Sequence, residues 1–244
     1  LEFRRVLFRS TYDAVMKLIP DHPILLCNRA NTLSSMGRLE DALAGYNRAL
    51  GLDAGYSDGY MNRGFLLLKT GRSLAALADF ERVLKIRPNY PLAVMNRAHA
   101  LFQLKRYQEA LAGYDAVLAA NAGDAATWSN RGNALSALDR DAEALESYER
   151  ALAIQPDFTD ARVNLGNTLL KLRRTADARA AYDAALAADP SAASAHYGHG
   201  VLLTDERRHV EAIAAYDAAL RIKPRSEEHT SELQSRLHLV CRLL

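Results

Sequence analysis

The sequence predicts an all-α protein, an α-solenoid of stacked antiparallel helix pairs. Three observations predict it: a pattern that returns every 34 residues, apolar residues at helical spacing inside each repeat, and a proline that closes most repeats. Periods of about 20 to 50 residues are typical of solenoids and related arrays. The composition agrees, because the chain is 49% hydrophobic and 25% charged and has only 7 prolines in 244 residues. These values favour a helix-rich globular protein.

The period is marked by residues that recur without a gap between Thr11 and Pro224. An alanine returns six times, at Ala42, Ala76, Ala110, Ala144, Ala178 and Ala212. Four residues after each alanine stands an aromatic: Tyr46, Phe80, Tyr114, Tyr148, Tyr182 and Tyr216. A small residue precedes each alanine by twelve places: Ala30, Gly64, Ala98, Gly132, Gly166 and Gly200. The regularity predicts six equivalent structural units.

Each repeat is expected to form two amphipathic helices. In the fourth, the first helix carries Thr127, Trp128, Arg131, Gly132 and Leu135, spaced three or four residues apart. After a polar turn, the second helix carries Ala144, Leu145, Tyr148, Ala151 and Leu152. Pro156 then ends it, because proline lacks the amide hydrogen and clashes with the preceding turn. One hairpin cannot bury its apolar face alone, so neighbouring hairpins must stack.

The fourth repeat closely resembles the tetratricopeptide repeat, whose signature it matches at Trp128, Gly132, Leu135, Ala144, Tyr148, Ala151 and Pro156. The resemblance implies a right-handed superhelix in which the first helix of each repeat lines the concave side. Six repeats are expected at residues 23–56, 57–90, 91–124, 125–158, 159–192 and 193–226. Residues 11–22 match the second helix of an earlier, truncated repeat. Because neither end shows a polar capping helix, we expect the sequence to be an internal piece of a longer protein.

The two ends of the sequence have a different origin from the repeats. One set of codons for Arg225–Gln234, read on the opposite strand, encodes a stop followed by Leu1–Ser10. This inverted repeat resembles translated read-through of a sequencing adapter. We therefore interpret residues 1–10 and 225–244 as adapter-derived, including the last two residues of the sixth repeat, and exclude them from functional argument.

Excluding the ends changes the charge balance. They hold six of the 31 basic and four of the 29 acidic residues, which leaves 25 of each sign. A neutral chain gives no electrostatic reason to expect nucleic acid or an anionic membrane as a partner. No run of about 18 apolar residues is present, so no membrane insertion is expected. The compartment stays open, with the cytoplasm as the default.

The predicted concave face carries a series of asparagines at the sixth place of five repeats, broken by Gly198 in the last. They are Asn28, Asn62, Asn96, Asn130 and Asn164. Each primary amide can donate to and accept from a peptide backbone, so the series suits an extended peptide. It is similar to the asparagine ladder of O-linked N-acetylglucosamine transferases. The alternative is that asparagine is merely a soluble choice on an exposed face.

Further candidate binding residues fall on the same face. The second and third repeats place there Met61, Met95, Phe65, Leu68, Leu92 and Phe102, and the later repeats place Asn133, Asn167 and Lys171. Apolar side chains, methionine above all, suit an adaptable binding surface. The alternative is that packing between repeats buries some of them. The fifth place holds no lysine in any repeat, so the clamp that binds chaperone C-termini is not expected.

Four arginines take the seventh place, at the edge of the buried stripe: Arg29, Arg63, Arg97 and Arg131. We expect each aliphatic stem to pack while the guanidinium reaches an acidic group at the rim, with Glu81, Asp115 and Glu149 as candidate partners. His196, His199 and His209 are expected to be ordinary surface histidines, because no Cys or carboxylate completes a metal site. No catalytic residue, metal or cofactor is expected.

The sequence thus favours a protein-interaction scaffold that binds an extended peptide or a partner domain in the concave groove, with partner identity and oligomeric state open. The main alternative is the substrate-recruiting arm of a protein glycosyltransferase or sulfotransferase whose catalytic domain lies outside this sequence. That alternative rests on the repeated Asn-Arg-Gly at residues 62–64 and 130–132, which is analogy at the level of the fold. A structural or self-associating spacer is the third possibility.

Overall fold

The computed structural model describes residues 19 and 21–223, and all described regular structure is helical. The chain divides into two compact units, unit 1 at residues 1–120 and unit 2 at residues 121–244. The segments interpreted above as adapter-derived and nearly all of the expected truncated repeat lie outside the described residues. The described part is an all-α solenoid, as the sequence predicts.

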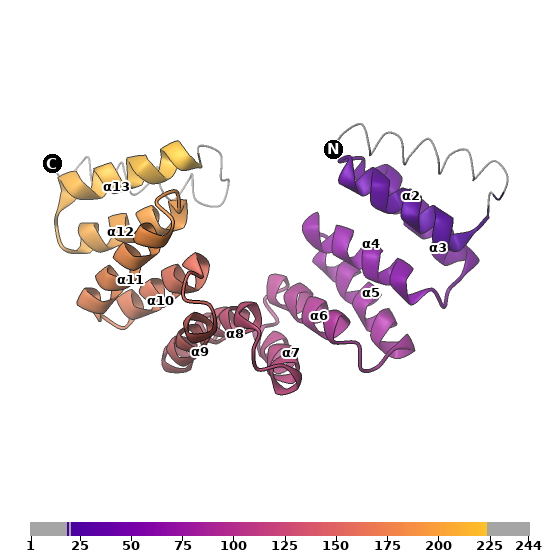
Figure 1. Cartoon of the computed structure of the whole chain (residues 1–244), viewed down its shortest axis with the longest axis horizontal. Coiled ribbons are helices and arrows are strands. Elements are labelled where there is room, and N and C mark those ends of the chain that lie inside the picture. The colour runs from indigo at the N-terminus through magenta and orange to yellow at the C-terminus, as the bar shows by residue number, and fades with distance from the viewer. Residues whose placement is uncertain (1–18, 20, 224–244) are drawn as a thin grey trace. The chain divides into compact units, whose positions relative to one another are not determined.

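Unit 1 holds three helical hairpins, drawn in indigo to magenta in Figure 1. Their helices are α2 (Pro23–Ser35), α3 (Leu39–Leu52), α4 (Ser57–Lys69), α5 (Ser73–Ile86), α6 (Pro91–Gln103) and α7 (Tyr107–Ala120). Each first helix packs against the second helix of its own repeat, and α3 and α5 also contact the first helix that follows. Prolines at the start of α2 and α6 cost nothing there, because the first helical amides have no partner within the helix.

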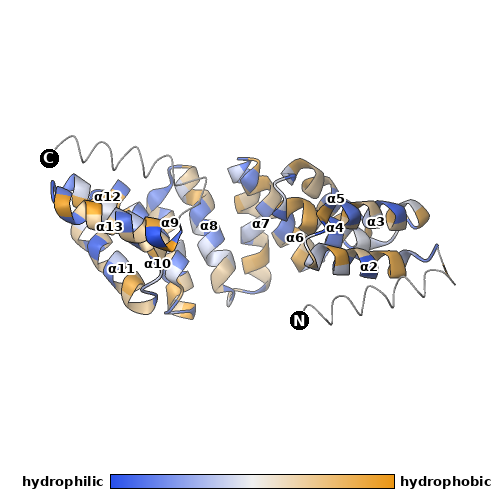
Figure 2. Ribbon diagram, turned by 90° about the horizontal axis from the view of Figure 1, so that it is seen from above, coloured by the Kyte–Doolittle hydropathy of each residue, from blue (hydrophilic) through white to orange (hydrophobic). Residues whose placement is uncertain are grey.

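Unit 2 repeats this arrangement with three more hairpins. Its helices are α8 (Ala125–Ala137), α9 (Asp141–Ile154), α10 (Thr159–Lys171), α11 (Thr175–Ala188), α12 (Ala193–Asp205) and α13 (His209–Ile222). Within the unit, the first helices α8, α10 and α12 contact their neighbours along the stack. Each helix has both hydrophobic and hydrophilic stretches (Figure 2), because one side faces a neighbour and the other does not.

A repeated arginine marks the turn inside every hairpin. The six residues are Arg38, Arg72, Arg106, Arg140, Arg174 and Arg208, each directly before a second helix. The backbone amide of each arginine donates to the carbonyl of a leucine five residues earlier, at 2.8 to 3.0 Å. The residue directly before each arginine adopts a left-handed φ of 56 to 78°. This bond closes the first helix. Five of the guanidinium groups pair with an acidic residue three positions later in the chain. Arg72 has Ala75 at that position, and it pairs with Glu40 of the preceding repeat instead.

The two helices of each hairpin approach so closely that only one of two facing positions carries a Cβ in each of the six repeats. These are the eighth and 23rd positions of the repeat: Ala30 and Gly45, Gly64 and Asp79, Ala98 and Gly113, Gly132 and Ser147, Gly166 and Ala181, Gly200 and Ala215. A Cβ on Gly113 would lie 2.8 Å from the Cβ of Ala98, and one on Gly45 would lie 3.0 Å from the Cβ of Ala30. The small residue predicted from sequence is therefore half of a pair.

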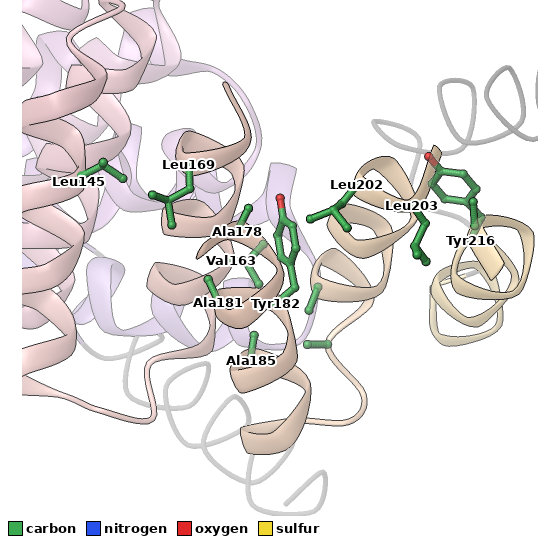
Figure 3. Packing of buried hydrophobic residues seen from close by; sticks show 13 residues of the cluster. Leu145, Val163, Leu169, Ala178, Ala181, Tyr182, Ala185, Leu202, Leu203 and Tyr216 are labelled. Carbon is green, nitrogen blue, oxygen red and sulfur yellow. The ribbon is translucent and has the colours of Figure 1, made fainter. Parts of the chain in front are cut away.

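An aromatic ring fills the space beside each close approach. The rings of Tyr46, Phe80, Tyr114, Tyr148, Tyr182 and Tyr216 are all almost fully buried. Where the eighth position is glycine the ring lies over it, so that a Cβ on Gly132 would meet the Tyr148 ring at 2.5 Å. In unit 2, Figure 3 shows Tyr182 between Val163 and Leu202, which come from the first helices on either side of it. The aromatic thus joins its own hairpin to the next.

We predict that Gly113→Ala destabilises the protein, because overpacking costs about 1–3 kcal/mol and exceeds the gain of up to about 1 kcal/mol in helix propensity. Adding Ala98→Gly removes the opposing methyl and should recover part of the loss. Denaturant unfolding measures both effects. Gly51→Ala in α3, where a Cβ would meet nothing within 4 Å, is the control and should not destabilise. Additive effects at positions 98 and 113 would contradict the close approach.

We predict that the thiol of Cys27 is unreactive in the folded protein. Its side chain is fully buried, and burial raises its pKa to about 11, so the reactive thiolate is scarce near neutral pH. The measurement is titration with a thiol reagent at pH 8 in a Cys241→Ser variant, before and after denaturation. Labelling should require denaturant, and rapid labelling of the native protein would show that the first repeat is not packed as described.

Candidate functional site

Two grooves lie on the faces of successive first helices, one between the first and second hairpins of unit 1 and one between the second and third hairpins of unit 2. Groove A, in unit 1, has a volume of about 280 Å³ between α2 and α4. It is lined by Asn31, Ser34, Tyr46, Asn62, Phe65, Leu66 and Lys69. Groove B, in unit 2, has a volume of about 450 Å³ between α10 and α12. It is lined by Asn167, Leu170, Lys171, Arg173, Tyr182, Tyr197, Val201 and Asp205. Each groove includes the aromatic residue of its own hairpin, Tyr46 or Tyr182.

The asparagine series does not present one uniform set of amides. In unit 1, Asn28 and Asn62 are half-buried, and no described residue bonds the Asn62 side chain. Asn96 is buried, and its Nδ2 donates to the Leu92 carbonyl of its own helix at 2.6 Å. In unit 2, Asn130 is half-buried, and the Nδ2 of Asn164 donates to the Oδ1 of Asn133 at 2.9 Å. Of the series, Asn62 is the member that lines a groove.

At the break in the series, Gly198, the aromatic ring of the preceding repeat lies where the amide would be. A Cβ at this position would lie 2.5 Å from Cε1 of Tyr182, the aromatic residue of the preceding repeat. The ring occupies the space into which an asparagine side chain would extend. Tyr182 thus takes the place of the amide beside the sixth repeat, and the ring lines groove B.

The asparagines at the ninth place hold the tyrosine hydroxyls of their own hairpins. Tyr148 donates to Asn133 at 2.8 Å, Tyr182 to Asn167 at 2.7 Å, and Tyr46 to Asn31 at 2.5 Å. The second repeat has no hydroxyl at this place, and there Phe65 meets Phe80 edge to face at 6.2 Å between ring centroids. The pairing is not general, because repeats 3 and 6 keep the tyrosine with His99 and Val201 at the ninth place, and the Tyr216 hydroxyl lies 3.2 Å from Oγ1 of Thr204 instead. Asn31, absent from the predicted site, was detectable from its match to Asn133 and Asn167.

The apolar candidates differ in exposure. Met61 is buried at 4% exposure, so packing rather than an open surface accounts for it. Met95 and Phe102 are half-buried, and Phe102 lies against Tyr107 with the ring centroids 5.2 Å apart. Phe65 is 40% exposed and lines groove A. Of these four, Phe65 thus offers an apolar contact in a groove.

Arg63 and Arg97 of the seventh place reach an acidic group as the sequence predicts, and Arg131 donates to Oγ of Ser147 at 2.7 Å. Arg63 makes a two-bond ion pair with Asp79, at 2.8 and 2.6 Å, and donates to Asn47 at 2.6 Å. The hydrogen bonds to Asp79 raise the pKa of Arg63. The predicted pair of Arg97 with Glu81 is present at 3.6 Å. Asp79, 3% exposed, was not predicted as a partner, although it stands where the other repeats have Gly, Ser or Ala.

The histidines of the sixth repeat have different surroundings. His199 is half-buried beside Asp183, with Nε2 3.9 Å from the carboxylate, and burial lowers its pKa. Nε2 of His196 lies 3.1 Å from the Pro190 carbonyl. Within residues 19 and 21–223, no three His, Cys, Asp or Glu side chains gather as metal ligands. Over the same residues, every helix is too short or too polar to cross a membrane.

The stacked hairpins and the grooves on their first helices define a helical-repeat scaffold. Models of the tetratricopeptide repeat match residues 27–91 and 163–227, residues 67–131 and residues 125–158. The chain belongs to the tetratricopeptide repeat family, whose members are generally protein-interaction scaffolds. No curated protein matches the sequence.

Solved structures share the fold at low sequence identity. A tetratricopeptide repeat protein from Parabacteroides merdae has a TM-score of 0.80 and 19% identity, over 96% of this chain and 91% of that one. TTC0263, a thermophilic TPR protein of Thermus thermophilus, has a TM-score of 0.66 and 24% identity, over 77% and 100%. YrrB, a TPR protein with an unusual peptide-binding site, has a TM-score of 0.62 and 24% identity, over 75% and 95%. At these identities the likeness shows the fold.

We predict that Asn133→Ala destabilises the chain by about 1–3 kcal/mol, because it leaves the part-buried hydroxyl of Tyr148 without its acceptor. Combining it with Tyr148→Phe should cost less than the sum of the single changes. A double-mutant cycle by denaturant unfolding measures this coupling. Asn89→Ala, in the exposed turn before α6, is the control and should have little effect. Strictly additive costs at positions 133 and 148 would contradict the pairing.

Proposed function

We propose that the chain is a scaffold that binds an extended peptide of a partner protein along its first helices, with groove A as the principal contact in unit 1. The observation that carries the proposal is the lining of groove A, where two primary amides, Asn31 and Asn62, lie in one cavity with the exposed ring of Phe65. Such amides suit peptide main chain, and the ring suits an apolar side chain.

The amides of groove A are available to a ligand. Asn31 uses its Oδ1 to accept from Tyr46, which leaves the two N–H donors of its amide group. Asn62 keeps donors and acceptor alike, since no described residue bonds its side chain. The peptide-binding site named for YrrB, a protein of the same fold, supports looking for a peptide here. The recruiting arm of a glycosyltransferase or sulfotransferase would use the same groove, so the test applies to either role.

We expect the full chain, labelled with a fluorophore, to bind a subset of an array of random dodecapeptides. Phe65→Ala and Asn62→Ala should each weaken binding to that subset about fivefold or more, because truncating a contact at an interface typically costs about 1 kcal/mol or more at the residues that matter. Half of the peptides are attached to the array through their N-terminus and half through their C-terminus, so that each end of the peptide is free in one half.

The matched control for Phe65→Ala is Leu74→Ala. Leu74 is a 71% exposed apolar residue of α5 in the same unit and outside groove A. All variants must show wild-type helicity by circular dichroism before binding is compared. Binding that is lost equally with Leu74→Ala, or no peptide binding at all, would refute the proposal.

A further inference from the structure

Two lysines occupy the same place, the thirteenth residue, in repeats 2 and 5. Lys69 lines groove A and Lys171 lines groove B. The Nζ of Lys171 lies 3.1 Å from Oδ1 of Asp141 and 3.7 Å from Oδ1 of Asp139. It also donates to the carbonyl of Ser136 at 3.2 Å. All three partners belong to the preceding repeat, so the charge of Lys171 is neutralised within unit 2.

The corresponding carboxylates are absent around Lys69. The residues of the first repeat that stand where Asp139 and Asp141 stand in the fourth are Gly37 and Leu39. Neither carries an acceptor side chain. Among residues 19 and 21–223, no acidic side chain forms an ion pair with Lys69. The ammonium group of Lys69 is therefore the one charge in a groove otherwise lined by neutral residues.

The missing partner follows from residue identity and not from a different backbone. The contact between the thirteenth residue and the 17th residue of the preceding repeat recurs in unit 1, where Ser73 donates to Oε1 of Gln103 at 2.5 Å. Lys69 stands where Gln103 does, one repeat earlier, and Leu39 stands where Ser73 does. The geometry that satisfies Lys171 and Gln103 is thus present at Lys69, with an apolar residue in place of the acceptor.

We infer that groove A binds a carboxylate of the peptide ligand at Lys69, next to an apolar side chain placed on Phe65. This inference rests on the peptide-binding function proposed above and names the chemistry of that ligand. The amide N–H groups of Asn31 and Asn62 lie in the same cavity and can donate to the second carboxylate oxygen or to the adjoining main chain. An Asp or Glu side chain or the C-terminus of the partner can supply the carboxylate.

The dodecapeptide array described above tests this. Peptides that bind in a Phe65-dependent way should be enriched in Asp or Glu beside an apolar residue. Resynthesis with Gln in place of Glu, or Asn in place of Asp, should weaken binding about two- to fivefold, the range of exposed charge pairs. If the C-terminus supplies the carboxylate, binding should instead be confined to peptides attached through their N-termini, and amidation should weaken it to the same degree.

Two variants of the protein separate the role of Lys69 from general charge effects. Lys69→Gln should abolish the preference for the acidic peptide over its amide form, whereas Lys85→Gln, on the exposed part of α5, should preserve it. Gly37→Asp places a carboxylate where Asp139 stands, at a left-handed φ of 78° that is close to the 56° of Asp139, and should also reduce the preference. Gly51→Asp adds the same charge away from the groove and should not.

The outcomes distinguish this inference from the function on which it rests. An array without any groove-dependent peptide would refute both. Groove-dependent peptides that lack acidic enrichment, or a preference that survives Lys69→Gln, would overturn the carboxylate inference and leave peptide binding intact. Loss of the preference in Lys69→Gln but not in Lys85→Gln supports the inference, provided that circular dichroism and thermal melting match the wild type.

Discussion

The close approach of the two helices in each hairpin is the constraint on which the rest of the structure depends. At the eighth and 23rd positions only one Cβ fits, so alanine on one helix requires glycine on the other, as in Ala98 and Gly113. The space beside this crossing is then filled by the aromatic ring of the second helix, whose face lies over the glycine when the first helix provides it. Packing this tight leaves few alternatives, since interiors tolerate neither voids nor overlap. The register of each hairpin follows from it.

The arrangement of polar groups in the grooves also depends on this close approach of the two helices. Because the ring of Tyr46 or Tyr182 extends past the crossing, its hydroxyl reaches the ninth residue of the first helix and engages the oxygen of Asn31 or Asn167. The amide is thereby oriented, with its N–H groups left for other partners. A candidate contact of groove A is thus held in place by the core, which limits the entropy that it loses when a ligand binds. In these two hairpins the orientation of the groove amide therefore depends on the buried ring.

Much of the fold follows from the sequence because the same pattern occurs in all six repeats. The recurring alanine, aromatic and small residue predict two helices per repeat and an all-α solenoid, which the structure confirms. The candidate site is harder to predict, since residues at one place of the repeat have different surroundings. Asn62 lines a groove, Asn96 bonds its own helix, and Asn164 bonds the preceding repeat. Helical periodicity places all three on one face, but their partners depend on neighbours in other repeats.

The coupled positions also bear on how such an array can lengthen or shorten. Both pairs, eighth with 23rd and ninth with 24th, lie inside one hairpin, so a whole 34-residue segment carries its own matched partners. Duplication or deletion of complete segments leaves every pair intact. An exchange within a turn would join the first helix of one repeat to the second helix of another, placing Phe65 against Tyr148 or Ala98 against Ala181. Hairpins, and not single helices, are therefore the units in which this sequence can be copied, lost or rearranged during its history.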